Sequence, residues 1–534
     1  MLSISLGVSS AALSRGGARA IDRLATRILG PGHSTGGAPL TGDGTQKTYS
    51  ATFVNESGAD IDSMAIVLQG WMLTTTGTAA TGNTFAVTGN IEYPIAGTTT
   101  DIGTVTVPDG AHIRGGDLTP ATTIPAGASF KVNLFSTVPN GQKYIVNLGF
   151  AGIVTKKKKS LLRKEAIYAI GDSIMTNNGA AAYAAAAGRC PCYHMSISGT
   201  TAQAYGASSS ANFARQVALA EALGITRFVS DFGTNDFGAS TTLANLQTYL
   251  LAMKSRANDA GILFSQTTML PRVTKLANIT ASSVTSSGTV MTVTVPDATK
   301  FVVGKSYLIA GSTQTEYNQV VVLKTRNTGN NTLTFNFPGS ATTPATGTIT
   351  LTSHKYSNTV EFQVGFSAKF QFNNSCDRAL FNAWVRGGAF DDFIEWADAC
   401  EPSRDSGRWL VGGESAMITD VQPASVVTGS PLTATRFQTN YAAGSGTMAN
   451  GGAQFTSGAN LGQYRTASNN TAGDYTSGSA FGNVPTVGNT IDMIPGNCTA
   501  TDDGTHPRVA QGSKGGQALI DAPTVAKFTE WLAA

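Results

Sequence analysis

The chain has 534 residues, a formal net charge of +3 and a charged fraction of 13%, well below the roughly 25% usual in soluble domains. Its length predicts about two to four domains rather than one core. The small net charge argues against nucleic acid as a partner, and no apolar stretch is long enough to cross a membrane. The many glycines and polar residues suit β-rich, loop-rich surfaces outside the cytoplasm or on a virus particle.

Residues 1–45 are expected to form an N-terminal arm with a helix. Arginines recur at every fourth position from 15 to 27 beside an apolar stripe, and Gly30 and Pro31 would end the helix. This amphipathic helix would either dock a virion or cell-surface partner or cap the first domain. The start lacks the leading positive charge of a secretory signal, so no clear signal peptide is expected.

Residues 46–150 are predicted to be an all-β sandwich. Apolar or β-branched runs are separated by turn residues and occupy 49–54, 64–73, 84–93, 104–107, 130–135 and 144–148. The dense basic run from Lys156 to Lys159 is interpreted as a solvated linker that marks the domain boundary.

Residues 160–272 alternate between strand and helix patterns. Buried-type strands are predicted at 166–170, 225–230 and 262–269. Helices are predicted at 212–223 and from a cap at Ser240 or Thr241 to Gly261. This alternation indicates a parallel sheet covered on both sides by helices.

The alternation is interrupted twice before the chain ends. Residues 273–357 return to period-two strands and are predicted to be an inserted β domain. Residues 358–534 resume the α/β part, with helical patterns at 377–386, 390–399 and 525–532. Within them, 411–500 is rich in glycine, serine and threonine, and forms either a third small β unit or long ordered loops.

No metal site or cofactor is predicted. The five cysteines are an odd number, which argues against a full disulfide framework but leaves one or two bridges open. The run from Cys190 to His194 could form one corner of a zinc site, but no second ligand pair has zinc-like spacing. No phosphate loop or nucleotide fingerprint is present.

Ser173 is the candidate nucleophile. It follows a buried-type strand directly, in Gly171-Asp172-Ser173, and precedes a predicted helix. A strand-to-helix turn at the carboxyl end of a parallel sheet exposes the side chain and directs backbone N–H groups to the same point. An ester is opened by such a nucleophile together with a base and donors that hold the oxyanion.

His506 is the candidate base. Only five histidines are present, and His506 alone has a carboxylate three residues before it, Asp503. A turn of that length lets the aspartate reach imidazole Nδ1 and leaves Nε2 for the serine.

Four segments in order resemble the blocks of the GDSL/SGNH hydrolases, a family of serine esterases. Gly171-Asp172-Ser173 looks like the first block and Gly233-Thr234-Asn235-Asp236 like the third. The run 503–507 looks like the last block, and Gly199 best matches the glycine of the second. The resemblance covers roughly residues 165–272 and 358–534.

The resemblance implies a fold and a set of roles. The fold would be a three-layer α/β/α arrangement around a flavodoxin-like parallel sheet. Ser173 would be the nucleophile and His506 its base, with Asp503 orienting the imidazole. Ser173, Gly199 and Asn235 would form the oxyanion hole. Gly206 competes with Gly199 for its role, and Asp502 could stand in for Asp503.

Several functions fit these residues. The first is a carbohydrate O-acetyl esterase, or deacetylase, that removes short acyl groups from an acylated polysaccharide or glycan. A lipase or thioesterase of the same fold is an alternative. Another is a non-catalytic adhesion protein of a virion, such as a phage tail protein, which would suit a homotrimer. An extracellular or virion-associated location fits the first and the last of these.

Overall fold

A computed structural model describes residues 20–31, 33, 37–186, 188, 190–207, 210–275, 278–339, 341–354, 363–409, 422–440, 451–471, 474–494, 501, 505–507 and 516–533. The chain divides into two compact units. The first comprises Met1–Met269, Ala383–Glu395 and Asp521–Ala534, and the second comprises Leu270–Asn382 and Trp396–Ile520. Each unit is described by itself below.

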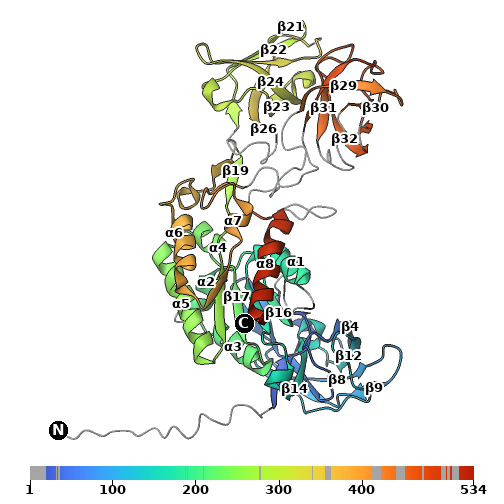
Figure 1. Cartoon of the computed structure of the whole chain (residues 1–534), viewed down its shortest axis with the longest axis vertical. Coiled ribbons are helices and arrows are strands. Elements are labelled where there is room, and N and C mark those ends of the chain that lie inside the picture. Colours follow the sequence, from blue (N-terminus) through green and yellow to red (C-terminus); the bar gives the residue numbers. More distant parts are fainter. Residues whose placement is uncertain are drawn as a thin grey trace, which may run out of the picture. The chain divides into compact units, whose positions relative to one another are not determined.

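The first unit begins with two antiparallel sheets (Figure 1). One has the order β1 (Ala20–Leu24), β14 (Phe150–Lys158), β5 (Met64–Gln69) and β11 (His112–Arg114). The other has the order β10 (Val105–Val107), β8 (Phe85–Glu92), β12 (Ser129–Thr137) and β4 (Gln46–Val54), with β9 (Thr99–Asp101) beside β8. The Phe53 ring of β4 lies 5.3 Å from the Phe150 ring of β14, so aromatic side chains join the two sheets.

Short two-stranded pairs complete this β-rich part. They join β6 (Trp71–Thr74) to β7 (Gly77–Ala80) and β3 (Leu40–Thr41) to β13 (Lys143–Tyr144). The strands predicted at 49–54, 84–93, 104–107 and 130–135 correspond to β4, β8, β10 and β12. Side-chain burial alternates along β12, which is the pattern of a strand with one face in a core.

The predicted N-terminal helix is wrong over residues 20–29, while residues 15–19 lie outside the described part. Ala20–Leu24 pairs antiparallel with β14, and β2 (Ile28–Leu29) pairs parallel with β16 (Cys192–Ser196). Leu24 and Ile28 are buried by this pairing, as is the neighbouring Arg23. The segment is therefore stabilised more by strand pairing with two sheets than by the helical pattern of its sequence, because a helix here would need a surface on which to pack its apolar side.

The lysine run is not a linker. Residues 156–158 are the end of β14 and pair with β1, so this β structure continues beyond the predicted boundary at 150. The Nζ of Lys156 lies 2.8 Å from Asp117 Oδ2, and Lys157 pairs with Asp62. Neighbouring carboxylates therefore let a basic segment form a strand.

The first unit also contains a six-stranded parallel sheet. Its order is β2, β16, β15 (Ile167–Gly171), β17 (Arg227–Ser230), β18 (Leu263–Thr267) and β28 (Asp392–Ile394). Every neighbouring pair runs parallel. All residues of β15, β16 and β17 are buried, as expected for strands covered on both faces.

Helices pack on both faces of this sheet (Figure 1). Arg227 and Phe228 are neighbours in β17, so their side chains point to opposite faces. The Arg227 guanidinium lies 4.3 Å from the Trp531 ring of α8 (Gly516–Ala533), and the Phe228 ring lies 5.1 Å from Phe213 of α3 (Asn212–Ala222). Helix α3 matches the predicted helix at 212–223, and α8 includes the one predicted at 525–532.

Other helices of the first unit follow the sheet strands. They are α1 (Ala180–Ala185), α2 (Ala202–Gly206), α4 (Thr234–Gly238) and α5 (Leu243–Asp259). Helix α5 matches the predicted helix that stops at Gly261, but its cap is Thr242, whose side chain accepts a hydrogen bond from Asn245 N, and not Ser240 or Thr241.

The helix predicted at 390–399 is wrong. Residues 392–394 form the edge strand β28, and only Ala397–Cys400 (α7) is helical. Asp392 accepts a hydrogen bond from Trp531 Nε1 at 2.6 Å and one from Lys527 Nζ at 3.1 Å, which fixes this segment at the sheet edge. The preceding α6 (Asp377–Trp384) agrees with the helix predicted at 377–386.

The second unit contains two β bodies. A seven-stranded antiparallel sheet has the order β20 (Ile279–Thr280), β26 (Gly347–Ser353), β23 (Ser306–Ser312), β24 (Val320–Asn327), β25 (Thr332–Asn336), β22 (Val290–Thr294) and β21 (Ser283–Ser287). A short pair joins β19 (Val273–Lys275) to β27 (Gln363–Gly365). Apart from β27, these strands lie in the segment 273–357, which was predicted as an inserted β domain.

The glycine-rich segment 411–500 contains a β unit rather than long loops. A closed barrel has the order β29 (Gln422–Gly429), β30 (Arg436–Thr439), β33 (Asp474–Ser477), β32 (Tyr464–Thr471), β31 (Gly452–Phe455) and β34 (Thr490–Ile494). Its core holds the rings of Phe437, Phe455, Tyr475 and Phe481. Scattered aromatics in a polar sequence thus supply one small core.

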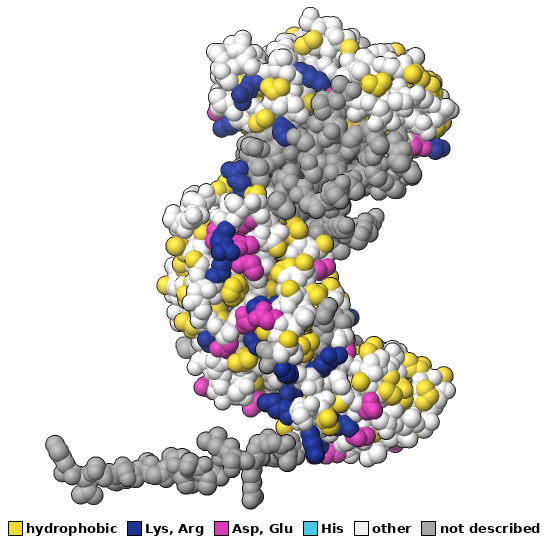
Figure 2. All heavy atoms as spheres, viewed as in Figure 1, with side chains coloured by type: hydrophobic (Ala, Val, Ile, Leu, Met, Phe, Trp, Pro, Cys, Tyr) yellow, Lys and Arg dark blue, Asp and Glu magenta, His cyan; other side chains and the backbone are white. Residues whose placement is uncertain are grey.

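Charged side chains are sparse on the face shown in Figure 2, as the low charged fraction requires. Across the described residues, no helix combines the length and the apolar character needed to span a bilayer.

Candidate active site

Ser173 is the second residue after the end of β15 and the first helical residue that follows the strand. Its side chain is half-buried, whereas Asp172 is fully buried. Asp172 Oδ1 accepts a hydrogen bond from Ile174 N at 2.8 Å, and its carbonyl accepts one from Thr176 N at 2.9 Å. The aspartate therefore holds the strand-to-helix turn and places the serine at its open side.

Ser173, Gly199 and Asn235 follow three neighbouring parallel strands. β15 lies between β16 and β17, and parallel strands end at the same edge of the sheet. After β15 the chain forms β16, the neighbour of β15 on one side. It then crosses to form β17, the neighbour on the other side, so the direction of strand order reverses at β15. Such a switch point is where open α/β sheets bind ligands.

Hydrogen bonds join the three loops. Thr200 Oγ1 donates to Gly171 O at 2.9 Å, and Ile197 N donates to the same carbonyl at 3.2 Å. Asn235 Nδ2 donates to Thr200 O at 3.2 Å. Because an amide nitrogen carries two N–H groups, Asn235 keeps a second donor beyond this bond.

Gly199 and Gly206 have different surroundings. Gly199 has a φ of +85°, and a Cβ added there would meet no atom within 4 Å. Gly206 ends α2, and an added Cβ would lie 2.2 Å from Tyr249 O of α5. At Gly199 the backbone conformation favours glycine, whereas at Gly206 the close packing against α5 leaves no room for a side chain. This contrast favours Gly199 over Gly206 as the loop glycine.

A second buried carboxyl group, which sequence reasoning missed, contacts the nucleophile turn. Asp231 follows β17, and its Oδ1 accepts a hydrogen bond from Asp172 N at 3.0 Å. Burial raises the pKa of Asp231, and the neighbouring Asp172 raises it further. The one signal in the sequence was an aspartate directly after a buried strand.

Asp236 joins the loop after β17 to α2. Its carboxylate accepts hydrogen bonds from Ala202 N at 2.9 Å and Gln203 N at 3.3 Å. Burial raises the pKa of Asp236 to about 6, although these two bonds oppose the shift. Asp236 therefore positions the loop that carries Asn235.

Two further histidines meet behind the nucleophile turn. His33 Nδ1 lies 3.3 Å from His194 Nδ1 and 3.4 Å from Ser196 Oγ. Burial lowers the pKa of His33 to about 4 and also lowers that of His194, so both imidazoles are neutral at pH 7. The two residues lie 161 positions apart, and nothing in the sequence pairs them.

His506 lies in the second unit, whereas Ser173, Gly199 and Asn235 lie in the first. It is half-buried, and an antiparallel bridge between Thr501 and Pro507 closes the loop that contains it. Asp502 and Asp503 lie outside the described residues. The pairing of Ser173 with His506, and of His506 with Asp503, therefore stays a prediction.

Among the described cysteines, Cys190, Cys192, Cys376 and Cys400 are buried and form no disulfide. Cys498 lies outside the described residues. Within the described part, no group of three or more His, Cys, Asp or Glu side chains is arranged to hold a metal ion.

Gly171→Ala is expected to destabilise the first unit by roughly 1–3 kcal/mol or more, because it overpacks the nucleophile turn. The added Cβ would lie 1.7 Å from Asp231 Oδ1 and 2.8 Å from Met175 Cβ. A lower melting temperature by circular dichroism would show this. Gly116→Ala is the matched control, because nothing lies within 4 Å of its Cβ position. Equal melting temperatures for the two variants would contradict the packing argument.

No protein-family profile and no curated protein matches the chain. Among solved structures, the esterase EstA of a Pseudoalteromonas species matches with 21% identity and a TM-score of 0.17, over 20% of this chain and 60% of that one. The protein YxiM of Bacillus subtilis matches with 16% identity and a TM-score of 0.20, over 41% and 57% of the two chains.

A salicylyl-acyltransferase from a tetracycline biosynthetic pathway matches with 11% identity and a TM-score of 0.17, over 43% of this chain and 59% of that one. The chain thus spans less than two thirds of each of these three proteins. Identities and TM-scores this low carry no argument about function, so any assignment depends on the chain's own residues.

Proposed function

We propose that this chain is a serine ester hydrolase of the SGNH type, with Ser173 as its nucleophile. One observation carries the proposal: Ser173 stands near the carboxyl end of an inner strand, and hydrogen bonds tie its turn to Thr200 on one side and to Asp231 on the other. The order of the four sequence blocks supports the same assignment.

The proposed reaction has two steps. The Ser173 hydroxyl attacks the ester carbonyl while His506 takes its proton, and Asp503 orients the imidazole. The C–O bond to the alcohol then breaks, and His506 returns the proton to the leaving oxygen. Water, activated by the same histidine, releases the acid from the acyl-enzyme and restores the serine.

The oxyanion would be held by three donors. These are the backbone N–H groups of Ser173 and Gly199 and the free amide N–H of Asn235. Donors fixed before the reaction stabilise the developing charge without reorganising, and the bond from Asn235 to Thr200 O supplies such fixation.

A short acyl group on a carbohydrate polymer is the proposed substrate. The low charge, the polar loops and the additional β bodies suit a neutral polymer better than a lipid. An extracellular or virion-associated location is part of this proposal.

Labelling with a fluorophosphonate tests the proposal, because this reagent forms a covalent bond with an activated serine. Peptide mass spectrometry is expected to find the label on Ser173 in the folded chain. Heat-denatured protein is the control and should stay unlabelled, since activation needs the fold. A label on another serine, or none at all, would reject Ser173 as nucleophile.

Asn235→Ala is expected to lower kcat for p-nitrophenyl acetate by about 10²- to 10³-fold with a small change in KM, because the lost donor acts on the transition state. Asn245→Ala is the matched control, since Asn245 is an exposed residue of α5. Steady-state kinetics of both variants measure the effect. A loss confined to KM would remove Asn235 from the oxyanion hole.

A further inference from the structure

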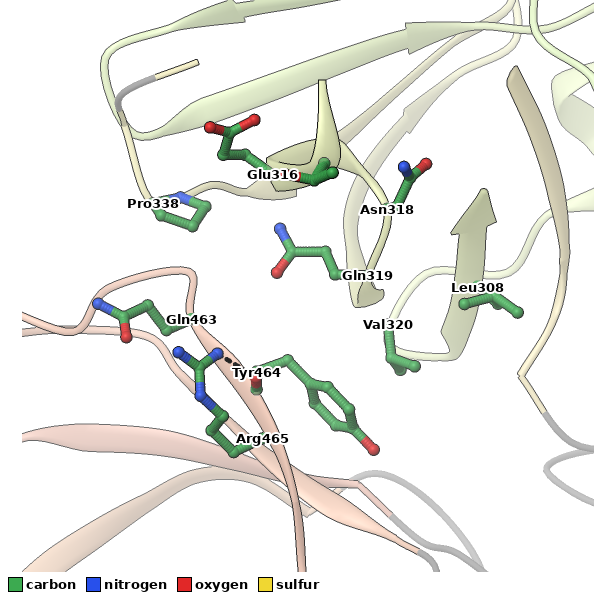
Figure 3. Close-up of a pocket in the computed structure, with 10 residues that line it drawn as sticks. Leu308, Glu316, Asn318, Gln319, Val320, Pro338, Gln463, Tyr464 and Arg465 are labelled. Carbon is green, nitrogen blue, oxygen red and sulfur yellow. Dashed lines mark hydrogen bonds between the residues drawn. The ribbon is translucent and has the colours of Figure 1, made fainter. Parts of the chain in front are cut away.

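The second unit contains a pocket of about 640 Å³ between its two β bodies (Figure 3). The sheet side contributes Glu316, Gln319 and Pro338, and the barrel side contributes Gln463, Tyr464 and Arg465. The volume falls within the roughly 300–1,000 Å³ of small-molecule sites. No function considered above uses these residues.

The two walls of the pocket are fixed to each other. Val322 N of β24 donates to Gln454 Oε1 of β31 at 3.3 Å, and Lys324 forms an ion pair with Asp492. Val320, Val322 and Ile494 share a small apolar core on which Tyr464 packs. The pocket is therefore formed before any ligand arrives, which lowers the cost of binding.

Amide groups line the middle of the pocket. The Gln319 side chain points across it towards Gln463 (Figure 3). Gln319 Nε2 is shielded from solvent and has no hydrogen-bond partner among the described residues. Gln463 Oε1 accepts from Gly482 N at 2.8 Å, which orients its amide. An unpaired buried amide is costly, and a ligand oxygen that reaches this nitrogen would satisfy it.

The pocket lining contains one positive and one negative side chain, and the positive one is held in place. Arg465 Nη1 donates to Tyr464 O at 2.8 Å, and its Nε donates to Ala480 O at 2.8 Å. Glu316 supplies a carboxylate on the opposite wall. One positive and one negative group favour neither an anion nor a cation as ligand.

The lining combines apolar and polar surface. Leu308, Val320 and Pro338 contribute carbon surface beside the amides. This mixture matches a sugar ring, which has an apolar C–H face and hydroxyl groups that both donate and accept. We propose that this pocket binds one or two neutral glycosyl units of a carbohydrate chain. The further claim that this carbohydrate is also the polymer deacylated at Ser173 rests on the proposed function. The binding of the carbohydrate in the pocket does not.

Calorimetric titration of the full-length Ser173→Ala protein tests the inference without turnover. The probes are tri- to hexasaccharides of glucose, xylose, rhamnose and N-acetylglucosamine, each with and without chemical O-acetylation. At least one probe is expected to bind with a Kd of about 1 mM or tighter. Gln319→Ala in the same background should weaken that binding at least tenfold, and Glu316→Gln should also weaken it.

Gln438→Ala is the matched control, because Gln438 is exposed on β30 of the barrel and does not line the pocket. Circular dichroism would verify that all variants fold. Failure of the whole panel to bind, or equal binding by the Gln319→Ala and Gln438→Ala proteins, overturns the inference.

The two proposals fail separately. Gln319→Ala with Ser173 intact should hydrolyse p-nitrophenyl acetate at the unaltered rate. Saccharide binding by a chain that is not labelled at Ser173 would keep the pocket and reject the esterase. A chain that is labelled at Ser173 and active, but binds no saccharide, would keep the esterase and reject the pocket.

Discussion

Ser173→Ala is expected to lower the rate of p-nitrophenyl acetate hydrolysis by about 10⁴-fold or more, because it removes the atom that forms the acyl-enzyme. The Ser173 side chain is half-buried, and the turn is held by Asp172 and Thr176, so the variant should fold normally. Initial rates of the purified proteins, with circular dichroism as a folding check, measure the effect.

Ser255→Ala is the matched control for that experiment, because Ser255 is exposed on α5. Its rate should equal that of the unaltered chain. If Ser173→Ala kept the rate of the control, the nucleophile would have to be another residue.

His506→Ala is expected to cost a comparable factor, about 10⁴-fold or more, since a nucleophile and its base act as one unit. The experiment is informative because Ser173 and His506 belong to different compact units. A large loss in kcat would show that the second unit supplies the base.

His112→Ala is the control for this variant, because His112 is half-buried in β11 of the β-rich part. It should keep the rate of the unaltered chain. An active His506→Ala protein would move the base elsewhere and make the first-unit histidines His33 and His194 the next candidates.

The sequence predicted the elements whose pattern is local. Short apolar runs marked β15, β17 and β18, because central strands of a parallel sheet are buried on both faces and show as unbroken apolar segments. The same logic placed Ser173 and Asn235 after strand ends, whereas the strand before Gly199 was not predicted and that residue was assigned by resemblance. Parallel pairing then brings these positions to one edge, as the structure has it.

Elements that depend on a distant partner were not predictable. Residues 20–24 and 392–394 form strands only because β14 and β18 offer them an edge. The basic end of β14 is stabilised by Asp62 and Asp117, which lie far away in the sequence. The contacts of Asp231 with Asp172 and of His33 with His194 likewise follow from the fold and leave no pattern of their own.

The position of α8 has a consequence for how the protein is made. Phe528 lies 5.0 Å from Tyr183, and Trp531 covers Arg227, so α8 completes the first unit. A ribosome reaches these residues only after translating the intervening 270–520, which takes roughly 10–50 s at about 5–20 residues per second. During that interval the Arg227 side chain of β17 lacks its contact with Trp531, while most of the residues synthesised belong to the second unit. The first unit therefore acquires its last helix only after nearly all of the second unit has been synthesised, although its own synthesis begins first.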